Sequence, residues 1–582
     1  MRRLIALVST ALLAGCAASP QSVRPPAGPT EIQILALNDF HGNLEPPGLA
    51  YDGAKGAVPT GGAAYLATAL KEVRTPSSIT VAAGDLISAS PLVSSLFYDE
   101  PTVEALSDSG LALASVGNHE FDRGPAELKR MQSGGCREQK PGDTRQSCKL
   151  EPFKGASFQY LAANVIGPDG QPLFPATAIR DIGGVRIGFI GMTLKETGTL
   201  VSPDGVRGLA FADEAATANA LVPYLRDAGA KAIVLLIHQG GSIKGKYDDQ
   251  SCPGLTGDIL PIVDKLDPAI RLVVSGHTHN AYICHLPIAG GGERLLTSSG
   301  KYGALVTDIR LTFGPDGSLS GERADFVPVQ GEAIGNARLK VPLNPAYRVF
   351  QADPGVAALV GRYKVAAAAI ADRPVGTLSA PLSKGDISGE SQASELIADG
   401  QLYVARDPAK GAAELAFMNN GGARTDLLPG AGGVVTYGQI FAMQPFANNL
   451  VTITLTGADI KALLEQQFDS GLNTVARPNL DHAVGQCEIL LRPVAGSRAA
   501  DRQRHGRRQA ARSVAELPRH RQQLPRVGRG QFHGAGARHQ PRRRRPRSRR
   551  DRGLPQDQPA RAAAGQGGRP DAEGMGVAVQ LT

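Results

Sequence analysis

Short apolar runs alternate with amphipathic helical patterns from residue 31 to about residue 330, and this alternation constrains the fold more than any other feature. Each run is six to eight residues long, as is typical of a buried strand, and helical stretches such as 61–74 and 213–229 lie between runs. Strands that alternate with helices predict a layered α/β domain. The expected strands are residues 31–37, 78–84, 112–117, 185–192, 231–237 and 270–276.

The chain continues well beyond this domain, since 582 residues are too many for a single hydrophobic core. Asp353 and Pro354 have the residue types of an N-cap and a first helical position, so we expect a long connector helix to begin there. A second α/β domain follows, and the composition then changes to Arg, Gln, Ala, Pro and Gly, which is typical of a disordered basic tail. The expected boundaries are 31–330 for the first domain, 331–373 for the linker and connector helix, 374–480 for the second, incomplete domain and 481–582 for the tail.

The first 16 residues have the features of a bacterial lipoprotein signal peptide. Two arginines precede an apolar run that is too short to remain as a membrane span, and the run ends in LAGC at residues 13–16. This ending resembles the lipobox, in which Cys16 would carry the acyl chains that anchor the protein. Ala17 rather than Asp follows it, which favours the outer membrane, facing the periplasm or the cell surface. The alternative is a plain signal peptide cleaved near Ala18; in either case a Pro/Ser-rich tether reaches to about residue 30.

Export makes disulfides possible, and five cysteines remain once Cys16 is lipidated. Two of them flank the polar loop CREQKPGDTRQSC and are expected to form a local bridge, and two more would tie together loops near the polar motifs described next. The fifth, Cys487, is left over, which is a first indication that the sequence is altered late in the chain. The expected pairs are Cys136 with Cys148 and Cys252 with Cys284.

Polar side chains stand at the C-terminal ends of five of the expected strands. In open α/β sheets this edge collects ligands, and five strand ends that all carry His, Asp or Asn make a purely structural role improbable. Cysteine is missing from the set, which argues against a structural zinc site. Mixed imidazole, carboxylate and amide groups suit Mn, Zn, Fe or Co in an open catalytic site. The residues are Asp39, His41, Asp85, Asn118, His119, His238, His277 and His279.

In the order D-x-H, G-D, G-N-H-E, a lone His and G-H-x-H, these motifs resemble the calcineurin-like metallophosphoesterases. NDFHGN, SGES at 388–391, NNGGAR and QPFANNLV are further similar to the bacterial 5′-nucleotidase family, which includes periplasmic UDP-sugar hydrolases and 2′,3′-cyclic-nucleotide phosphodiesterases. The resemblance covers about residues 31–480. It implies a metallophosphoesterase domain followed by a nucleotide-binding 5′-nucleotidase C-terminal domain.

The resemblance also implies which residues bind which of two divalent metal ions. Asp85 would bridge both ions, and family members can have Gln at the position of His279. Two ions about 3.5–4 Å apart can bind a phosphate and lower the pKa of a water to about 7, so that a metal-bound hydroxide attacks phosphorus. The first ion would be held by Asp39, His41, Asp85 and His279, and the second by Asp85, Asn118, His238 and His277.

His119 would lie beside the ions as the catalytic cation. It would stabilise the transition state or protonate the leaving oxygen. Asp122, three residues later, would orient His119 and keep it charged, although a helix N-cap is an alternative role for this aspartate. We expect a structural role for Glu120.

In the second domain, the resemblance implies four substrate-binding residues. Arg424 can bind a phosphate or carboxylate with two N–H groups, and Phe446 can stack on a base, although without the family a role in the core would be favoured for Phe446. Asn448 can bond to the edge of the base, and Gly471 would let the backbone approach the ligand. In this family the second domain rotates against the first to bring the substrate to the metals.

The function that these residues predict is removal of phosphate from nucleotides. Alternatives within the family are a 2′,3′-cyclic-nucleotide phosphodiesterase, a UDP-sugar hydrolase and the related thiosulfohydrolase branch. A non-enzymatic alternative is a membrane-anchored lipoprotein whose tail, RRRRPRSRR, binds nucleic acid or anionic lipid non-specifically. We expect a nucleotide substrate and a membrane anchor as partners, and neither a specific nucleic acid nor an obligate protein partner.

The segment after about Leu480 is interpreted as the product of a shifted reading frame. Members of the family continue with a pattern like N-x-F-L-x-x-G-G-D, which carries a second stacking aromatic and a substrate-binding Asp, and no such pattern occurs here. Residues 519–540 instead show almost no hydrophobic periodicity. With GC-rich codons and the first base dropped, these residues allow the reading ATVNNFLASGGDNFTVLARGT. A genuine Arg-rich disordered tail is the alternative.

Overall fold

The structure is a computed structural model of the chain. The residues that it describes all fall in one compact unit. Cys16, Gly471 and Cys487 lie outside the described residues, as do residues 519–540. The described residues are 29–139, 143–335, 339–385, 391–446, 448–468, 482–485 and 575–580.

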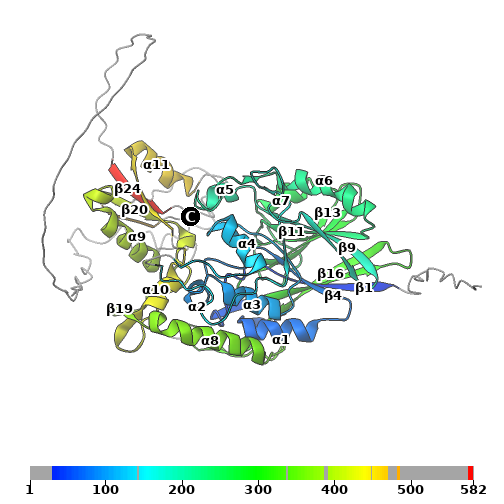
Figure 1. Ribbon diagram of the computed structural model, residues 1–582, viewed down its shortest axis with the longest axis horizontal. Coiled ribbons are helices and arrows are strands. Elements are labelled where there is room, and N and C mark those ends of the chain that lie inside the picture. Colours follow the sequence, from blue (N-terminus) through cyan, green and yellow to red (C-terminus); the bar gives the residue numbers. More distant parts are fainter. Residues whose placement is uncertain are drawn as a thin grey trace, which may run out of the picture. The chain divides into compact units, whose positions relative to one another are not determined.

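The first domain is built on two six-stranded sheets (Figure 1). In the first sheet the strands β1, β4, β5 and β6 run parallel, and β15 and β16 add an antiparallel edge beside β1. Its order is β16 (Leu319–Pro328), β15 (Leu305–Phe313), β1 (Thr30–Leu37), β4 (Ser78–Ala83), β5 (Leu113–Ser115) and β6 (Gln159–Leu161).

The second sheet also has four parallel strands, β9, β11, β12 and β14, but it has one antiparallel strand at each edge. Its order is β13 (Ala281–Pro287), β14 (Glu293–Ser299), β12 (Ile270–Val274), β11 (Ala232–His238), β9 (Val185–Thr193) and β8 (Thr177–Ile182). The edge strands were not expected, because the sequence patterns mark only the strands that alternate with helices.

Alternating side chains place the two sheets face to face, with helices on the outer sides. On β1, Ile34 points into the core between the sheets, whereas Leu35 points to the core beneath the helices. This is the layered α/β arrangement that the sequence predicts. Helices α1 (Ala63–Val73), α3 (Glu100–Asp108) and α4 (Pro125–Ser133) cover the first sheet, and α6 (Glu214–Asp227) and α7 (Ile259–Val263) cover the second.

Shorter elements complete the first domain and the linker. The two-residue to five-residue ladders pair β2 with β3, β7 with β10 and β17 with β18. Their bounds are Leu49–Gly53, Gly56–Thr60, Val165–Ile166, Ala210–Phe211, Ile334–Gly335 and Lys340–Val341, and the short helices are α2 (Leu92–Ser95) and α5 (Thr197–Leu200).

The connector helix α8, Pro354–Ala371, begins where the sequence predicts. The Asp353 carboxylate accepts hydrogen bonds from the backbone N–H of Gly355 at 2.9 Å and of Val356 at 3.1 Å, as an N-cap does. Tyr363 of this helix is fully buried in the core beneath the helices of the first domain. The helix is therefore packed against the first domain rather than free in solvent.

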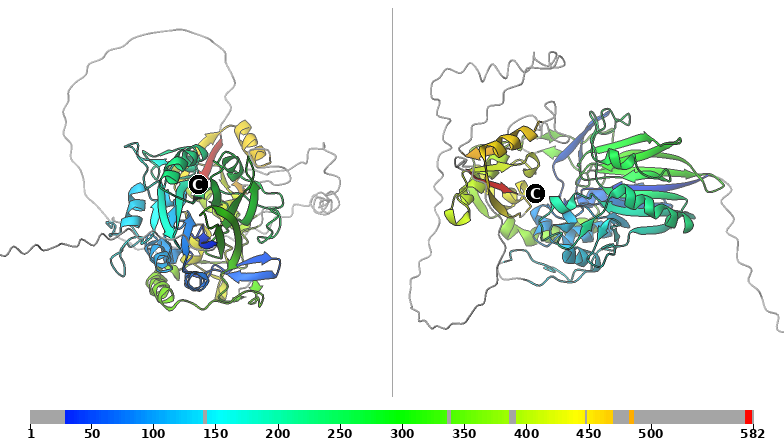
Figure 2. Two further views of the ribbon diagram at one scale, coloured as in Figure 1. Left: turned by 90° about the vertical axis from the view of Figure 1, so that its right-hand side faces the viewer. Right: turned by 90° about the horizontal axis from the view of Figure 1, so that it is seen from above.

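The second domain has its own core between helix α9 and a four-stranded sheet. Two strands of this sheet, β23 and β24, lie beyond residue 480, the expected end of the domain; β24 is the red arrow in Figure 2. The sheet order is β22 (Leu450–Leu455), β24 (Met575–Gln580), β20 (Leu415–Met418) and β23 (His482–Gly485), and the other elements are β19 (Pro374–Thr377), β21 (Val434–Thr436), α9 (Gln392–Ala405), α10 (Tyr437–Met443) and α11 (Gly457–Gln466).

Among the residues that the structure describes, none of the helices has the length and apolar character needed to cross a membrane.

Candidate metal centre

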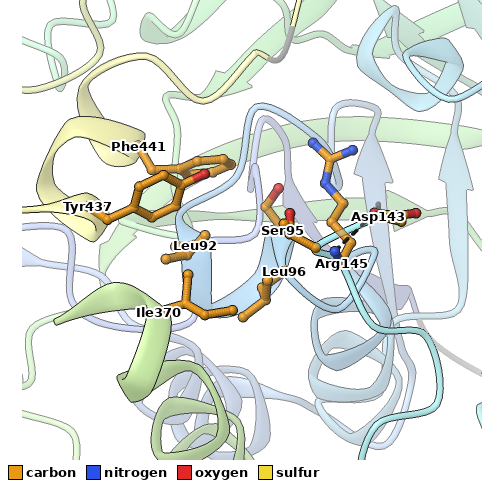
Figure 3. Close-up of a pocket in the computed structure, with 9 residues that line it drawn as sticks. Leu92, Ser95, Leu96, Asp143, Arg145, Ile370, Tyr437 and Phe441 are labelled. Atoms are coloured by element: carbon orange, nitrogen blue, oxygen red, sulfur yellow. Dashed lines mark hydrogen bonds between the residues drawn. The ribbon is translucent and has the colours of Figure 1, made fainter. Parts of the chain in front are cut away.

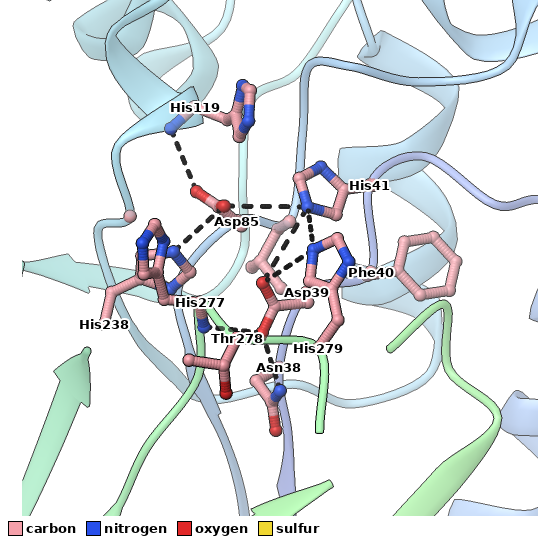
Figure 4. Close-up of polar contacts among 12 residues, drawn as sticks. Asn38, Asp39, Phe40, His41, Asp85, His119, His238, His277, Thr278 and His279 are labelled. Atoms are coloured by element: carbon pink, nitrogen blue, oxygen red, sulfur yellow. Dashed lines mark hydrogen bonds and ion pairs between the residues drawn. The ribbon is translucent and has the colours of Figure 1, made fainter. Parts of the chain in front are cut away.

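The predicted ligands meet because the strands that precede them end at the same edge of the two sheets. Asp39 follows β1, Asp85 follows β4 and Asn118 follows β5, while His238 is the last residue of β11. His277 follows β12 in the second sheet. Parallel strands present their carboxyl ends together, so residues far apart in sequence become neighbours (Figure 4).

Several of these residues have an unusual backbone conformation. Five of the predicted ligands are in the left-handed region although none is glycine. That conformation costs a residue with a side chain about 1–3 kcal/mol, and such residues cluster at functional sites. The φ values are 50° for Asp39, 46° for His41, 50° for Asp85, 71° for His277 and 58° for His279.

The first group of ligand atoms comes from Asp39, His41 and His279. The Nε2 atom of His279 is 3.3 Å from Asp39 Oδ1 and 3.1 Å from His41 Nε2. His41 Nε2 also lies 3.8 Å from Asp39 Oδ1 and 3.6 Å from Asp85 Oδ2. Three ligand atoms thus face one point, as a cation site requires.

The second group comes from Asp85, His238 and His277. Asp85 Oδ2 is 2.9 Å from His238 Nε2, and the rings of His238 and His277 have centroids 5.2 Å apart. Because Asp85 Oδ2 also faces His41, this one carboxylate lies between the two groups. A further group of ligand atoms joins His41 and Asp85 to His119.

The two aspartates are oriented by hydrogen bonds to their other oxygen. Asp39 Oδ2 accepts from Asn38 Nδ2 at 2.7 Å and from the backbone N–H of His277 at 2.9 Å. Asp85 Oδ1 accepts from the backbone N–H of His119 at 2.9 Å. In each case the protein anchors one oxygen and leaves the other directed at the imidazoles.

Two imidazoles are oriented in the same way through their outer nitrogen. His41 Nδ1 lies 3.0 Å from the carbonyl oxygen of Ser88, and His238 Nδ1 lies 2.8 Å from that of Ala83. A carbonyl can only accept, so each Nδ1 carries the proton, and Nε2 faces the centre.

Two buried candidate ligand atoms have no hydrogen-bond partner among the described residues. They are Asp39 Oδ1 and Asn118 Oδ1. Buried polar atoms without partners are costly. His238 Nε2 instead lies 2.9 Å from Asp85 Oδ2. Burial lowers the pKa of His238, but Asp85 outweighs burial and raises that pKa to about 10, so without a cation this imidazole is protonated. Divalent cations would satisfy the two oxygens and replace the proton on His238, so the donor set fits two such ions.

The charges of the site follow from burial and from these contacts. Burial lowers the pKa of His41 and of His279 well below its ordinary value, and lowers that of His277 to about 4, so these imidazoles are neutral and able to bind a cation. Burial raises the pKa of Asp85, but His238 and His119 outweigh it and hold that pKa well below its usual range. Asp85 is therefore a carboxylate.

His119 and Asp122 form the predicted pair beside this centre. His119 Nδ1 is 2.8 Å from Asp122 Oδ2, within the short 3₁₀ turn His119–Phe121 and the residue after it. Burial lowers the pKa of His119, but Asp122 and Asp85 together raise it above its ordinary value. The side chain can therefore carry a proton at neutral pH.

Glu120, for which only a structural role is expected from the sequence, has specific contacts with the centre. Its carboxylate accepts hydrogen bonds from the backbone N–H of Asp85 and of Leu86, each at 2.8 Å. Backbone donors leave no trace in a sequence motif, so only the place of Glu120 within GNHE could have indicated this role.

The predicted substrate residues of the second domain lie near His119. The Phe446 ring is stacked against the His119 ring, with centroids 6.2 Å apart and planes 24° apart. The Arg424 guanidinium lies 4.9 Å from the Phe446 ring centroid. Asn448 is half-buried in the same loop, and Gly471 lies outside the described residues.

Two lysines that the sequence did not single out lie beside Arg424. Lys384 Nζ donates to the Arg424 carbonyl oxygen at 3.2 Å, and Lys301 Nζ lies 4.9 Å from the Tyr302 ring centroid. Burial and the nearby Arg424 charge lower the pKa of Lys301 to about 8. The approach to the metal centre is thus positively charged, which suits an anionic substrate.

The four cysteines that were expected to pair form two disulfides. Cys136 is bonded to Cys148 and Cys252 to Cys284, with Cα atoms 5.5 Å and 5.7 Å apart. Cys252 precedes and Cys284 follows the His277 turn, so the second bond ties this part of the site together.

A cavity of about 250 Å³ lies apart from the predicted site residues (Figure 3). Apolar side chains of α2, α8 and α10 line it, including Leu92, Ile370 and Phe441. None of the predicted metal ligands contributes to its lining.

Comparisons with known proteins agree with this arrangement. The calcineurin-like phosphoesterase family matches residues 32–281, and the 5′-nucleotidase C-terminal domain matches residues 374–488. Endonuclease YhcR of Bacillus subtilis is 29% identical over 75% of this chain and 33% of its own length, and cell wall protein Lmo0130 of Listeria monocytogenes is 32% identical over 75% of this chain and 56% of its own. The chain thus spans a third to about half of the length of these relatives.

The fold recurs in a solved structure, that of a 5′-nucleotidase precursor from Thermus thermophilus. The TM-score is 0.58 at 23% sequence identity, and the match covers 75% of this chain and 78% of the other. Each domain matches one family, and the candidate ligands at the strand ends gather in the first domain. The chain therefore belongs to the 5′-nucleotidase family, with a calcineurin-like phosphoesterase domain followed by a 5′-nucleotidase C-terminal domain.

Proposed function

We propose that this chain is a metal-dependent phosphoester hydrolase that removes phosphate from nucleotides. The observation that carries the proposal is the pair of ligand groups with Asp85 Oδ2 between them, together with two buried oxygens, Asp39 Oδ1 and Asn118 Oδ1, that have no hydrogen-bond partner among the described residues. The first cation would be held by Asp39, His41, Asp85 and His279, and the second by Asp85, Asn118, His238 and His277.

When bound, two such cations supply Lewis acidity and a water of lowered pKa. The chain's own residues supply the rest of the chemistry. His119 would donate the proton on its Nε2 atom, and Asp122, which accepts from the Nδ1–H, keeps the imidazole protonated. Arg424 brings a fixed positive charge close to His119, which favours binding of a phosphate there.

A nucleotide is the favoured substrate because an aromatic ring stands beside the phosphate-binding end. Phe446, stacked on His119, offers a face to a base, and Asn448 lies two residues further along the same loop. Hydrolysis of 2′,3′-cyclic nucleotides or of UDP-sugars would use the same groups. Lmo0130 is named as a cell wall protein, which is in keeping with an exported chain here.

The N-terminus supports export and lipidation at Cys16. Incorporation of labelled palmitate into the full chain, abolished by Cys16→Ser, would establish the anchor. Release of a soluble, unlabelled protein cleaved near Ala18 would instead identify a plain signal peptide.

The function is tested with a substrate panel of AMP, 2′,3′-cyclic AMP and UDP-glucose. Hydrolysis should vanish after chelation and return when Mn, Co or Zn is added back. The panel identifies the preferred substrate and the add-back identifies the effective metal. Binding of nucleic acid that depends on salt but survives chelation, with no hydrolysis of any substrate, would favour the non-enzymatic lipoprotein instead.

A further inference from the structure

Glu120 is a fully enclosed carboxylate with an unusual set of partners. Its side chain is 2% exposed and forms no ion pair with Lys, Arg or His among the described residues. Burying a carboxylate without a cation is costly unless hydrogen bonds replace its water. Here four backbone N–H groups do so: those of Asp85 at 2.8 Å, Leu86 at 2.8 Å, Ile87 at 3.3 Å and Gly117 at 2.5 Å.

These four donors belong to two separate turns of the metal centre. Residues 85–87 form the turn after β4, which presents Asp85, and Gly117 belongs to the turn after β5, which presents Asn118. Each turn supplies a ligand to the second cation group. The Glu120 carboxylate therefore joins the two turns at the point where their ligands must be held at a fixed separation.

The two turns also lie too close together for a residue with a side chain at position 117. A Cβ atom on Gly117 would lie 2.1 Å from Asp85 Oδ1, so only glycine fits at this position. The Asp85 carboxylate is held from its other side by the His119 N–H. Asp85 is thus fixed through its own backbone N–H by Glu120 and through Oδ1 by His119, which leaves Oδ2 facing His238 and His41.

We propose that Glu120 is a positioning residue of the metal centre, whose carboxylate sets the distance between Asp85 and Asn118 and thereby the affinity of the second cation site. This rests on the metal centre of the proposed function. Glu120 acts only through its neighbours, because its four contacts are all with backbone N–H groups. Groups of this kind typically contribute about 10–100-fold to metal affinity.

The test is a titration of Mn²⁺ into the chelator-treated full-length protein, with free Mn²⁺ followed by electron paramagnetic resonance. Glu120→Gln preserves the size of the side chain but replaces one carboxylate oxygen by an NH₂ group. This NH₂ group would face two backbone N–H donors, so two hydrogen bonds would be lost. We expect the site that also uses Asn118 to weaken about 10–100-fold, and the other site, which shares only Asp85 with it, to weaken less. A variant with both affinities within about twofold of wild type would overturn the proposal.

The matched control is Glu127→Gln, since Glu127 is also a buried carboxylate but pairs with Arg130 and Arg137 away from the centre. It should lower the melting temperature and leave both Mn²⁺ affinities unchanged. If it weakens Mn²⁺ binding as much as Glu120→Gln does, the effect of Glu120 is general destabilisation and the proposal fails. If the wild-type protein binds no Mn²⁺, the proposed metal centre fails instead.

Hydrogen exchange of the wild-type protein tests the proposal even if the Glu120→Gln variant does not fold. In the metal-free protein, the amides of Asp85, Leu86 and Gly117 should exchange hydrogen slowly, because the Glu120 carboxylate accepts them. Rapid exchange at these amides, as in an unattached loop, would show that the carboxylate does not join the two turns.

Discussion

Asp85 of the metal centre and Arg424 of the second domain are held in different ways. Asp85 has no freedom: its backbone N–H, both of its carboxylate oxygens and its left-handed backbone are all constrained by neighbours. The Arg424 guanidinium forms no ion pair among the described residues and contacts the Phe446 ring at 4.9 Å. Cation–π contacts of this kind are worth about 0.5–2 kcal/mol.

This difference matches the chemistry required of the two regions. Cation sites tolerate little movement of their ligands. Five of the candidate ligands have a strained, left-handed backbone, and the surrounding strands and hydrogen bonds offset the free-energy cost of that strain. Groups that would contact the substrate rather than the cations need not be held as rigidly. Substitutions in the first region should therefore act on turnover through metal binding, and those in the second on selection among substrates.

The largest effect is expected from Asp85→Ala, which removes the oxygen between the two ligand groups. Turnover should fall by more than about 10³-fold. This is a larger loss than the one caused by removing a single hydrogen-bond donor to the transition state, which is about 10²–10³-fold. Metal analysis should show loss of at least one ion while circular dichroism remains that of a folded chain. Wild-type turnover with unchanged metal content would exclude Asp85 from the centre.

His119→Asn separates chemistry from metal binding within the same region. Both ions should remain and turnover should fall about 10²–10⁴-fold, the range for a general acid or an electrostatic stabiliser. His119 could instead be a metal ligand, because its ligand atom also falls in a group with those of His41 and Asp85. Loss of an ion from the variant would therefore identify His119 as a ligand.

The gathering of the candidate ligands at one place was predictable from the sequence because these residues follow apolar strands that are easily recognised. Asp39 and His238 stand at the ends of such strands, and strand ends of one sheet meet at one edge. Glu120 was not predictable, since its partners are backbone N–H groups of two turns. Lys301 was missed for a related reason: it follows β14, a strand that was not expected, and its nearness to Arg424 arises only from tertiary packing.

The fold was predictable to a similar extent. The helical patterns at 61–74 and 213–229 became α1, Ala63–Val73, and α6, Glu214–Asp227. The hairpins β13–β14 and β15–β16 were not expected, because a hairpin interrupts the alternation of strand and helix. The strand β24 lies at the far end of a segment whose composition indicates no structure.

Phe446→Ala tests the second region of the comparison. Stacking on a base is worth about 1–3 kcal/mol, so kcat/KM for AMP should fall about 10–100-fold. Glycerol 2-phosphate has no ring, and its hydrolysis should change less than about threefold. Equal losses on both substrates would mean that Phe446 acts by supporting His119, against which it stacks, rather than by binding a base.

The reading-frame hypothesis concerns the same region and extends further along the chain than residues 519–540. With the same single-base shift, residues 551–559, DRGLPQDQP, allow the reading IAAYLKTNP. Within it, the codons of Gln556 and Asp557 permit only Lys or Arg, and the reading as a whole suits a helix with one apolar side. In one shifted frame, therefore, two separate stretches allow a regular reading.

The smallest effect is expected from restoring that frame. A gene with one base corrected after about residue 480 should encode NNFLASGGDNF, which would supply a second ring to face Phe446 across a base. Stacking at the lower end of its range predicts a KM for AMP about five- to tenfold lower, with metal content and glycerol 2-phosphate hydrolysis unchanged. Because the metal ligands all precede residue 280, the correction should leave the first domain as it is. Sequencing decides first: an uninterrupted gene whose codons do not encode this pattern one base over would show the Arg-rich segment to be genuine.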